Sequence, residues 1–224
     1  MTKLITKALL IILFAVNLGC QKEDIEPVLS GSETGEADSQ KKPTDICPEY
    51  FYYYGQTKID LGAVNTSQII IGFQNGITSE QKAAFISQYP YLQSIKSEFN
   101  TGSANATVIT LNEGITCAEV EAAFIQLAKQ PEVRYATPFY QSPFDTNLLG
   151  ITNQFIINLK PGYTVDDLQI LTKRTKTEIV EQLGDITFIM SADKYATGNA
   201  LQMANEFAGF YQIDSSEPDF YYSY

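Results

Sequence analysis

A pattern of apolar and polar positions occurs twice between residues 45 and 224. Each copy begins with a run of β-branched and aromatic residues, continues through a turn that contains glycine, and reaches a threonine before a helical pattern. The two runs are residues 69–78 (IIIGFQNGIT) and 155–164 (FIINLKPGYT), which are 86 positions apart. Gly76 and Gly162 suit turn positions with positive φ. The spacing indicates an internal repeat of one structural unit.

The rest of each copy predicts the same further elements in the same order. Apolar residues at spacings of three and four predict two helices per copy, and alternating segments predict three more strands, the last of which runs into a proline. The helices are expected at residues 79–88, 117–130, 165–174 and 197–211. The strands are expected at residues 91–99, 106–111 and 133–140, and again at 178–183, 186–190 and 213–220.

The element order βαββαβ, repeated twice, predicts an α+β protein with two ferredoxin-like domains, 45–145 and 146–224. In this fold an antiparallel sheet carries two helices on one face. Domains of this size bury limited apolar area, so we expect the two copies to pack on each other. Tyr50–Tyr54 (YFYYY) and Lys58–Leu61 predict an extra β-hairpin before the first copy. The aromatic run is interpreted as a strand with both faces partly buried or, alternatively, as a platform for glycans.

The N-terminal residues resemble a bacterial lipoprotein signal. Residues 8–16 (ALLIILFAV) form an apolar run that fits a secretory signal and is too short to span a bilayer. Asn17-Leu18-Gly19-Cys20 resembles a lipobox, which implies a signal peptide over 1–19 and lipid on Cys20. Gln21-Lys22-Glu23-Asp24 resembles the export signal of surface-exposed lipoproteins of a Gram-negative phylum. We therefore expect an outer-membrane lipoprotein on the cell surface, anchored through Cys20. Residues 20–44, which contain no aromatic residue, are expected to be a disordered tether.

Composition excludes several classes of function. The chain has 15 Lys and Arg against 26 Asp and Glu, a net charge of -11, so nucleic acid is not an expected partner. The absence of His excludes Ser-His-Asp and Cys-His catalysis and His-ligated metal sites. No calcium-loop or phosphate-loop motif is present. We expect no enzyme activity, no cofactor and no metal.

Two cysteines remain besides Cys20. Cys47 and Cys117 are an even pair in a chain that is expected to reach an oxidising compartment. A disulfide between them would tie the segment before the first copy to its second helix. The alternative is two separate thiols, because spacing alone does not place two Cα atoms within bonding distance.

Four segments resemble the N-terminal propeptides of subtilisin-like serine proteases, including the fervidolysin-type prodomain, and the inhibitor family named after these propeptides. They are residues 153–162 (NQFIINLKPG), 199–205 (NALQMAN), 216–220 (SEPDF) and, in the first copy, 133–138 (VRYATP). The resemblance implies a stand-alone protein that binds or inhibits a subtilisin-like protease. In that family the sheet packs on the enzyme surface and the C-terminal tail enters the active-site cleft as an added strand.

The resemblance also assigns roles to residues of the second copy. It implies that an acidic pair caps helix N-termini of the enzyme and that the tail fills the cleft. The protease-binding residues would be Glu217, Asp219, Tyr221, Tyr222, Ser223 and Tyr224. Thr137 and Phe139 replace the acidic pair in the first copy, so the second copy is the expected docking half. Alternatively, the tail is an edge strand half covered by the other copy, and the protein is a surface-displayed protein-binding, glycan-binding or assembly module.

Overall fold

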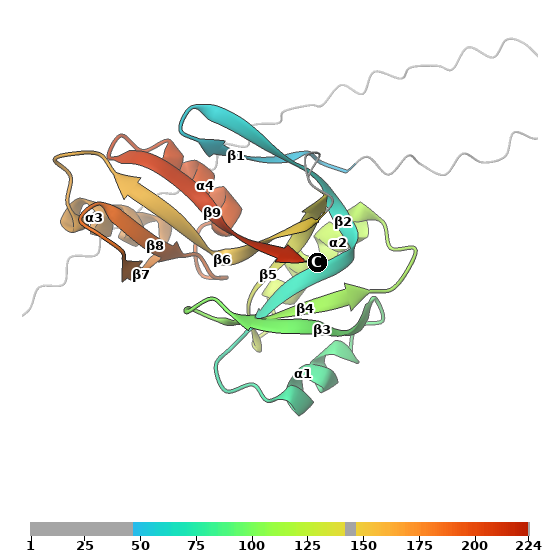
Figure 1. Cartoon of the computed structure of the whole chain (residues 1–224). Helices are drawn as coiled ribbons and strands as arrows, with labels where there is room; N and C mark the ends of the chain where they lie inside the picture. The colour runs from blue at the N-terminus through green and yellow to red at the C-terminus, as the bar shows by residue number, and fades with distance from the viewer. Residues whose placement is uncertain (1–46, 142–146, 224) are drawn as a thin grey trace, which may run out of the picture. The chain divides into compact units, whose positions relative to one another are not determined.

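The computed structural model describes residues 47–141 and 147–223, which belong to one compact unit, Pro43–Tyr224 (Figure 1). Four helices and nine strands in this part of the chain form an α+β fold, as predicted. The predicted signal peptide, Cys20, the tether and Tyr224 lie outside the described residues. No helix within the described ranges is long and apolar enough to cross a membrane.

The predicted order of elements is confirmed in both copies. The first half contains β1 (Tyr50–Tyr54), β2 (Thr57–Phe73), α1 (Ser79–Ile86), β3 (Leu92–Asn100), β4 (Asn105–Leu111), α2 (Cys117–Ala128) and β5 (Val133–Gln141). The second half contains β6 (Leu148–Leu159), α3 (Val165–Thr175), β7 (Glu178–Gln182), β8 (Thr187–Ser191), α4 (Ala200–Ala208) and β9 (Ile213–Ser223). The main difference is length, because β2, β6 and β9 all extend beyond the predicted strands.

The two predicted threonine caps begin their helices in the same way. Thr78 precedes α1 and Thr164 precedes α3. The backbone N–H of Thr78 donates to Oε1 of Gln81 at 2.8 Å, and that of Thr164 donates to Oδ2 of Asp167 at 2.9 Å. These bonds satisfy backbone groups that the first helical turn leaves unpaired. The glycine two residues before each threonine has a positive φ, of 87° and 93°, as the turn chemistry predicts.

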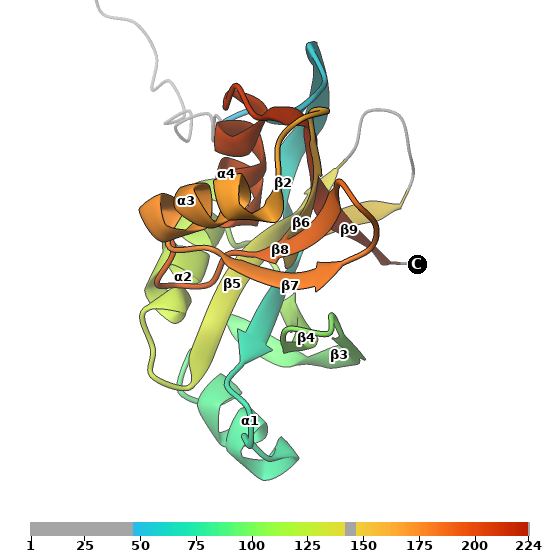
Figure 2. The ribbon, with the colours of Figure 1, turned by 90° about the vertical axis from the view of Figure 1, so that its left-hand side faces the viewer.

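All nine strands belong to one antiparallel sheet. The main path is β3-β4-β2-β5-β6-β8-β7, with β1 paired to β2 and β9 paired to β6. The order β3-β4-β2-β5 in the first half therefore recurs as β7-β8-β6-β9 in the second. The halves join where Phe139–Gln141 of β5 pairs with Leu148–Gly150 of β6. The two predicted domains thus share one strongly curled sheet, a half-barrel, and Figure 2 shows α2, α3 and α4 along one side of its strands.

The strand registers confirm the internal repeat residue by residue. β2 pairs with β5 as β6 pairs with β9, and each ladder has a register shift after its first few pairs, between Val64 and Ile69 in the first half and between Ile151 and Phe155 in the second. The equivalent pairs are Ile69–Pro138 and Phe155–Pro218, Ile70–Thr137 and Ile156–Glu217, Ile71–Ala136 and Ile157–Ser216, and Gly72–Tyr135 and Asn158–Ser215.

Two apolar clusters lie on opposite faces of the sheet. The larger one, beneath the helices, takes buried residues from both halves, including Phe73, Leu127, Phe155 and Phe207. Because side chains alternate along a strand, the intervening residues of β2, β4 and β5 point to the other face. There, together with Ala104 just before β4, they form a smaller cluster inside the curl: Ile70, Ala106, Val108, Tyr135 and Phe139. A core shared by both halves agrees with the expectation that the two copies pack on each other.

The aromatic strand β1 contacts both halves. The side-chain amide of Asn205 on α4 accepts a hydrogen bond from the backbone N–H of Tyr53 (3.0 Å) and donates to the carbonyl of Phe51 (2.9 Å). The rings of Tyr50 and Tyr52 lie 5.0 Å and 5.3 Å from rings of β5 and β9. Alternate rings of the run are therefore used in packing, while Tyr54 is 58% exposed. This arrangement agrees with the partly buried strand.

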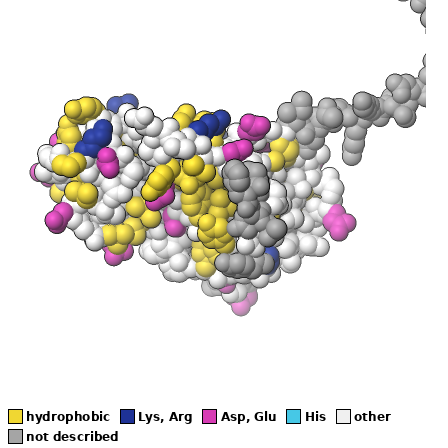
Figure 3. Space-filling model, turned by 45° about the horizontal axis from the view of Figure 1, so that its top comes forward, with side chains coloured by type: hydrophobic (Ala, Val, Ile, Leu, Met, Phe, Trp, Pro, Cys, Tyr) yellow, Lys and Arg dark blue, Asp and Glu magenta, His cyan; other side chains and the backbone are white. Residues whose placement is uncertain are grey.

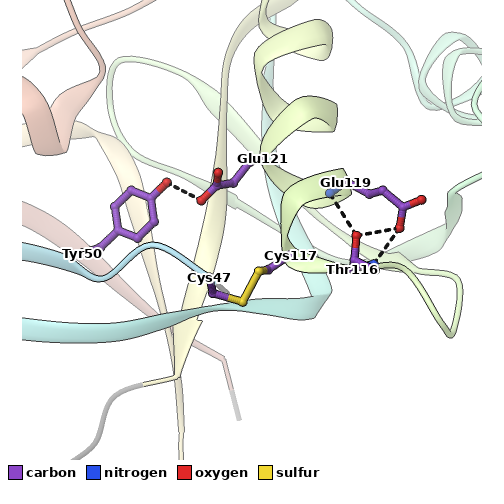
Figure 4. The surroundings of a disulfide bond; sticks show 6 residues. All are labelled: Cys47, Tyr50, Thr116, Cys117, Glu119 and Glu121. Carbon is purple, nitrogen blue, oxygen red and sulfur yellow. Dashed lines mark hydrogen bonds between the residues drawn. A yellow bond between two sulfur atoms is a disulfide. The ribbon is translucent and has the colours of Figure 1, made fainter. Parts of the chain in front are cut away.

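A disulfide joins Cys47 to Cys117 (Figure 4). The Cα atoms lie 5.7 Å apart, and the bond ties the segment before β1 to the first residue of α2. Close by, the hydroxyl of Tyr50 donates a 2.7 Å hydrogen bond to Glu121 on the same helix. Burial and the neighbouring carboxylate raise the pKa of Tyr50 above its usual range. Of the two alternatives that the sequence left open, a disulfide or two separate thiols, the structure contains the disulfide.

Candidate functional site

The sheet face opposite the helices differs between the two halves. In the first half it is apolar and lies inside the curl, where Ile70, Ala106 and Val108 are fully buried. In the second half the equivalent positions are only half-buried. We call these residues the open sheet face: Ile156, Asn158, Thr187, Ile189, Ser215 and Glu217. The repeat therefore buries this face in one copy and leaves it partly accessible in the other.

Hydrogen bonds fix the polar side chains of the open sheet face. Asn158 on β6 stands between β8 and β9 in the sheet. Its amide nitrogen donates to Oγ of Ser215 at 2.8 Å, and its amide oxygen accepts from Oγ1 of Thr187 at 2.6 Å. The corresponding position of the first half is Gly72, over which the Tyr135 ring lies. A polar ladder across three strands thus replaces a buried aromatic contact.

The next row of this face is mainly apolar. Ile156 on β6 pairs with Ile189 on β8 and with Glu217 on β9. Two partly buried isoleucines beside a carboxylate give a surface with an apolar centre and polar surroundings, the composition that protein-binding surfaces share. Sequence reasoning identified Glu217 but missed the isoleucines. One feature of the sequence could have indicated this face: Asn158 is a polar residue within a β-branched run, and its counterpart in the first copy is a glycine.

The C-terminal end of β9 lies against the first half. The ring of Tyr221 stacks on that of Phe99 with centroids 4.0 Å apart, and its hydroxyl is 3.3 Å from Oγ of Ser97. The hydroxyl of Ser223 donates to Gln68 at 3.0 Å and accepts from the Lys96 ammonium at 2.9 Å. These contacts hold the strand end inside the curl, next to β3.

The predicted protease-binding residues do not share one exposed surface. Glu217 belongs to the open sheet face, whereas Tyr222 is 47% exposed on the other side of β9. Tyr221 and Ser223 face β3, and Tyr224 lies outside the described residues. Asp219 is largely buried, which raises the pKa of its carboxyl group, and it accepts a 2.9 Å hydrogen bond from Thr152.

Residues 220–223 do not form the separate C-terminal tail that the propeptide resemblance implies. They continue β9 and pair with Leu148–Ile151 of β6. The physical reason is that β6 begins seven residues earlier than predicted and offers these residues a partner strand. The interpretation of the tail as an edge strand half covered by the other copy therefore agrees with the structure.

Within the described ranges, no three His, Cys, Asp or Glu side chains are placed to hold a metal ion. On the face in Figure 3, hydrophobic side chains form a band across the middle and a second group at the left end, with Lys and Arg side chains beside them. The open sheet face, which the comparison of the two copies identifies, is the strongest candidate for a binding surface.

No protein-family profile matches the sequence, no curated protein matches it, and no solved structure matches the fold at a significant level.

Proposed function

We propose that this protein is a non-catalytic cell-surface lipoprotein whose second half binds a subtilisin-like serine protease through the open sheet face. The proposal combines the propeptide resemblance with the strand order β7-β8-β6-β9, which is that of a ferredoxin-like fold. One observation carries it: the second half leaves partly accessible the sheet face with which such propeptides contact their enzymes, whereas the first half fully buries the equivalent apolar residues.

The chemistry of the open sheet face fits this role. Ile156 and Ile189 supply an apolar centre on neighbouring strands. The ladder through Asn158 is already hydrogen-bonded, so little side-chain ordering is needed when a partner binds. Glu217 supplies a carboxylate, which is favourable at a helix N-terminus of an enzyme. Asp219 cannot act with it as an equal partner, because its carboxylate is engaged with Thr152.

Insertion of the C-terminal residues into a protease cleft requires a rearrangement. Tyr221 would have to leave Phe99, and Ser223 would have to leave Gln68 and Lys96. Residues 220–223 would also lose their pairing with β6. Docking of the open sheet face requires none of these changes. We therefore assign binding to the sheet and treat the tail as a separate contribution.

The experiment is an inhibition assay of residues 43–224 against a panel of subtilisin-like proteases with a chromogenic substrate. Ile156→Arg places a charge in the centre of the open sheet face, and we expect it to raise the inhibition constant about tenfold or more. Ile170→Arg is the matched control, because Ile170 is 67% exposed on α3 of the same half.

Circular dichroism and thermal unfolding establish that both variants are folded. If the wild-type protein at a concentration of about 10 μM inhibits no member of the panel, its dissociation constant is weaker than micromolar and the protease target is rejected. Equal inhibition by both variants would instead reject the open sheet face as the contact surface. Rejection of the target would leave the alternative of a surface-displayed binding or assembly module.

A further inference from the structure

A groove lies where the two halves meet beside the helices, away from the open sheet face. Its walls come from α2 and β5 of the first half and from residues 192–199, which connect β8 to α4, in the second. Its volume of about 550 Å³ is within the range of small-molecule sites, roughly 300–1,000 Å³. We call it the interhalf groove, since neither half could form it alone.

The lining of the interhalf groove is mainly apolar. The apolar and aromatic residues that line it are Phe124, Ile125, Ala128, Tyr135, Ala136, Ala192, Tyr195 and Ala196. Two of them are strongly exposed, Ile125 at 51% and Tyr195 at 67%. Large apolar side chains that flank an apolar cavity remain in contact with water unless something covers them, and such surfaces commonly mark binding sites.

Hydrogen bonds from the connecting segment fix the shape of the groove. The backbone N–H of Lys194 donates to the carbonyl of Arg134 at 3.0 Å, and that of Ala192 donates to the carbonyl of Asn153 at 2.8 Å. The Lys194 ammonium donates to the carbonyl of Gln130, just beyond α2, at 2.6 Å. The segment is thus anchored to both halves. A ligand would therefore meet a preformed site and would not have to order the segment.

The charges around the groove favour an anion. Asp193, its one lining carboxylate, lies 3.6 Å from the Arg134 guanidinium, which also lies 3.7 Å from Glu178. The remaining lining charges are the ammonium groups of Lys129 and Lys194. Lys129 is exposed, and no carboxylate in the described part of the chain lies within ion-pair distance of it. A local positive charge in a chain of net charge -11 gives the groove a sign opposite to that of the whole protein.

We infer that the interhalf groove binds a small amphipathic anion. The apolar body of this ligand lies against Phe124, Ala128 and Ala196, and its carboxylate or equivalent head group lies at Lys129. Fatty acids and aromatic carboxylic acids share this chemistry. The inference does not depend on a protease target, because the groove and the open sheet face are formed by different residues.

The test is isothermal titration calorimetry of residues 43–224 with three probes that share a ten-carbon chain: decanoate, decanol and decyltrimethylammonium. We expect saturable binding of one decanoate per chain, weaker binding of decanol and the weakest binding of the cation. Aromatic carboxylates form a second arm that distinguishes between the two sources of the anion. Absence of decanoate and aromatic-carboxylate binding, or equal affinity for the cation, would overturn the inference.

Variants locate the ligand. Ala128→Trp fills the groove and should weaken decanoate binding at least tenfold. Ala122→Trp, the same substitution at an exposed position of α2 outside the groove, should leave binding unchanged. Lys129→Gln should weaken decanoate about two- to fivefold, the range for an exposed charge pair, without an effect on decanol. Lys129→Glu should shift the preference towards the cation, which keeps the test decisive if Ala128→Trp does not fold.

Analytical ultracentrifugation tests whether a second copy of the chain occupies the groove instead of a small ligand. A concentration-dependent dimer of the wild-type protein that Ala128→Trp abolishes would show that a second copy covers the groove, and the ligand inference would be wrong. Equal decanoate affinity of the two tryptophan variants would place the ligand elsewhere and would likewise contradict it.

Discussion

The ring of Tyr221 lies parallel to that of Phe99, with an interplanar angle of 8° and centroids 4.0 Å apart. The two residues come from opposite ends of the curled part of the sheet, β9 and β3. Side chains rather than a strand ladder connect these strands in the described structure, since β3 pairs with β4 and β9 with β6. The stack therefore closes the curl over the smaller apolar cluster.

Loss of this stack should destabilise the whole unit. Tyr221→Ala removes the aromatic pair and part of the cover of the smaller cluster, and we expect a loss of about 2–3 kcal/mol in the free energy of unfolding. Tyr222→Ala, one residue further on and 47% exposed, should cost less than about 1 kcal/mol. Urea unfolding followed by circular dichroism measures both. Equal losses would show that the stack contributes nothing specific.

The close approach of Tyr135 to Gly72 should make that glycine irreplaceable. A Cβ atom at Gly72 would lie 1.9 Å from the nearest ring carbon of Tyr135, so the ring would have to move within a packed cluster. We expect Gly72→Ala to cost about 2–3 kcal/mol in the free energy of unfolding. Gly184→Ala is the control, because no atom lies within 4 Å of its added Cβ. A tolerated Gly72→Ala would mean that β5 can shift relative to β2.

Reduction of the disulfide should lower stability without a change of fold. The bond joins residues 70 positions apart, and a loop of that length predicts a loss of about 2–4 kcal/mol when the unfolded chain is no longer restrained. The measurement compares the double variant Cys47→Ala and Cys117→Ala with the wild type in denaturant, with and without a reducing agent. The reductant should destabilise only the wild type, and an equal effect on the double variant would contradict this assignment.

The pKa of Asp219 predicts a pH dependence of stability. Burial raises the pKa of this carboxyl group above its ordinary value. Its contribution to stability is therefore fully present below the ordinary Asp pKa and is lost as pH rises through the higher pKa of the folded state. The Asp219→Asn variant cannot lose this proton. The stability of the variant relative to that of the wild type should therefore increase from pH 4 to pH 7. Denaturant unfolding at both pH values measures the difference, and a constant difference would show that Asp219 does not titrate abnormally.

The sequence predicted the local elements well because their signals are local. The threonine caps, the turn glycines and the spacing of apolar residues in α2 and α4 each determine structure within a few residues, and all were found. Two separate strands were predicted on either side of Asn65 and Ser67, one over Lys58–Leu61 and one from Ile69. In the structure the Asn65 side chain accepts a hydrogen bond from the backbone N–H of Ser67 inside one continuous strand, β2, where its register with β5 shifts.

The joining of the halves could not be predicted from these local signals. It depends on the pairing of residues 139–141 with 148–150 and on the contacts of residues 220–223 with β3 and β6. Pairing between distant segments is determined by shape and total burial, which periodicity does not reveal. The same limit applies to the candidate site. Glu217 was identified from a motif, whereas Ile156 and Ile189 became candidates only when the structure showed which copy leaves its sheet face partly accessible.

The pairing of Asn205 with strand β1 also bears on the order of folding. This side chain satisfies backbone groups of Tyr53 and Phe51, which precede it by 152 and 154 positions. Contacts between such distant residues require closure of a very long loop, so they form late and slow the search for the native state. Strand β1, although it is the first element of the chain, therefore reaches its final position only after α4 has formed. The first half consequently cannot complete its folding before the second half.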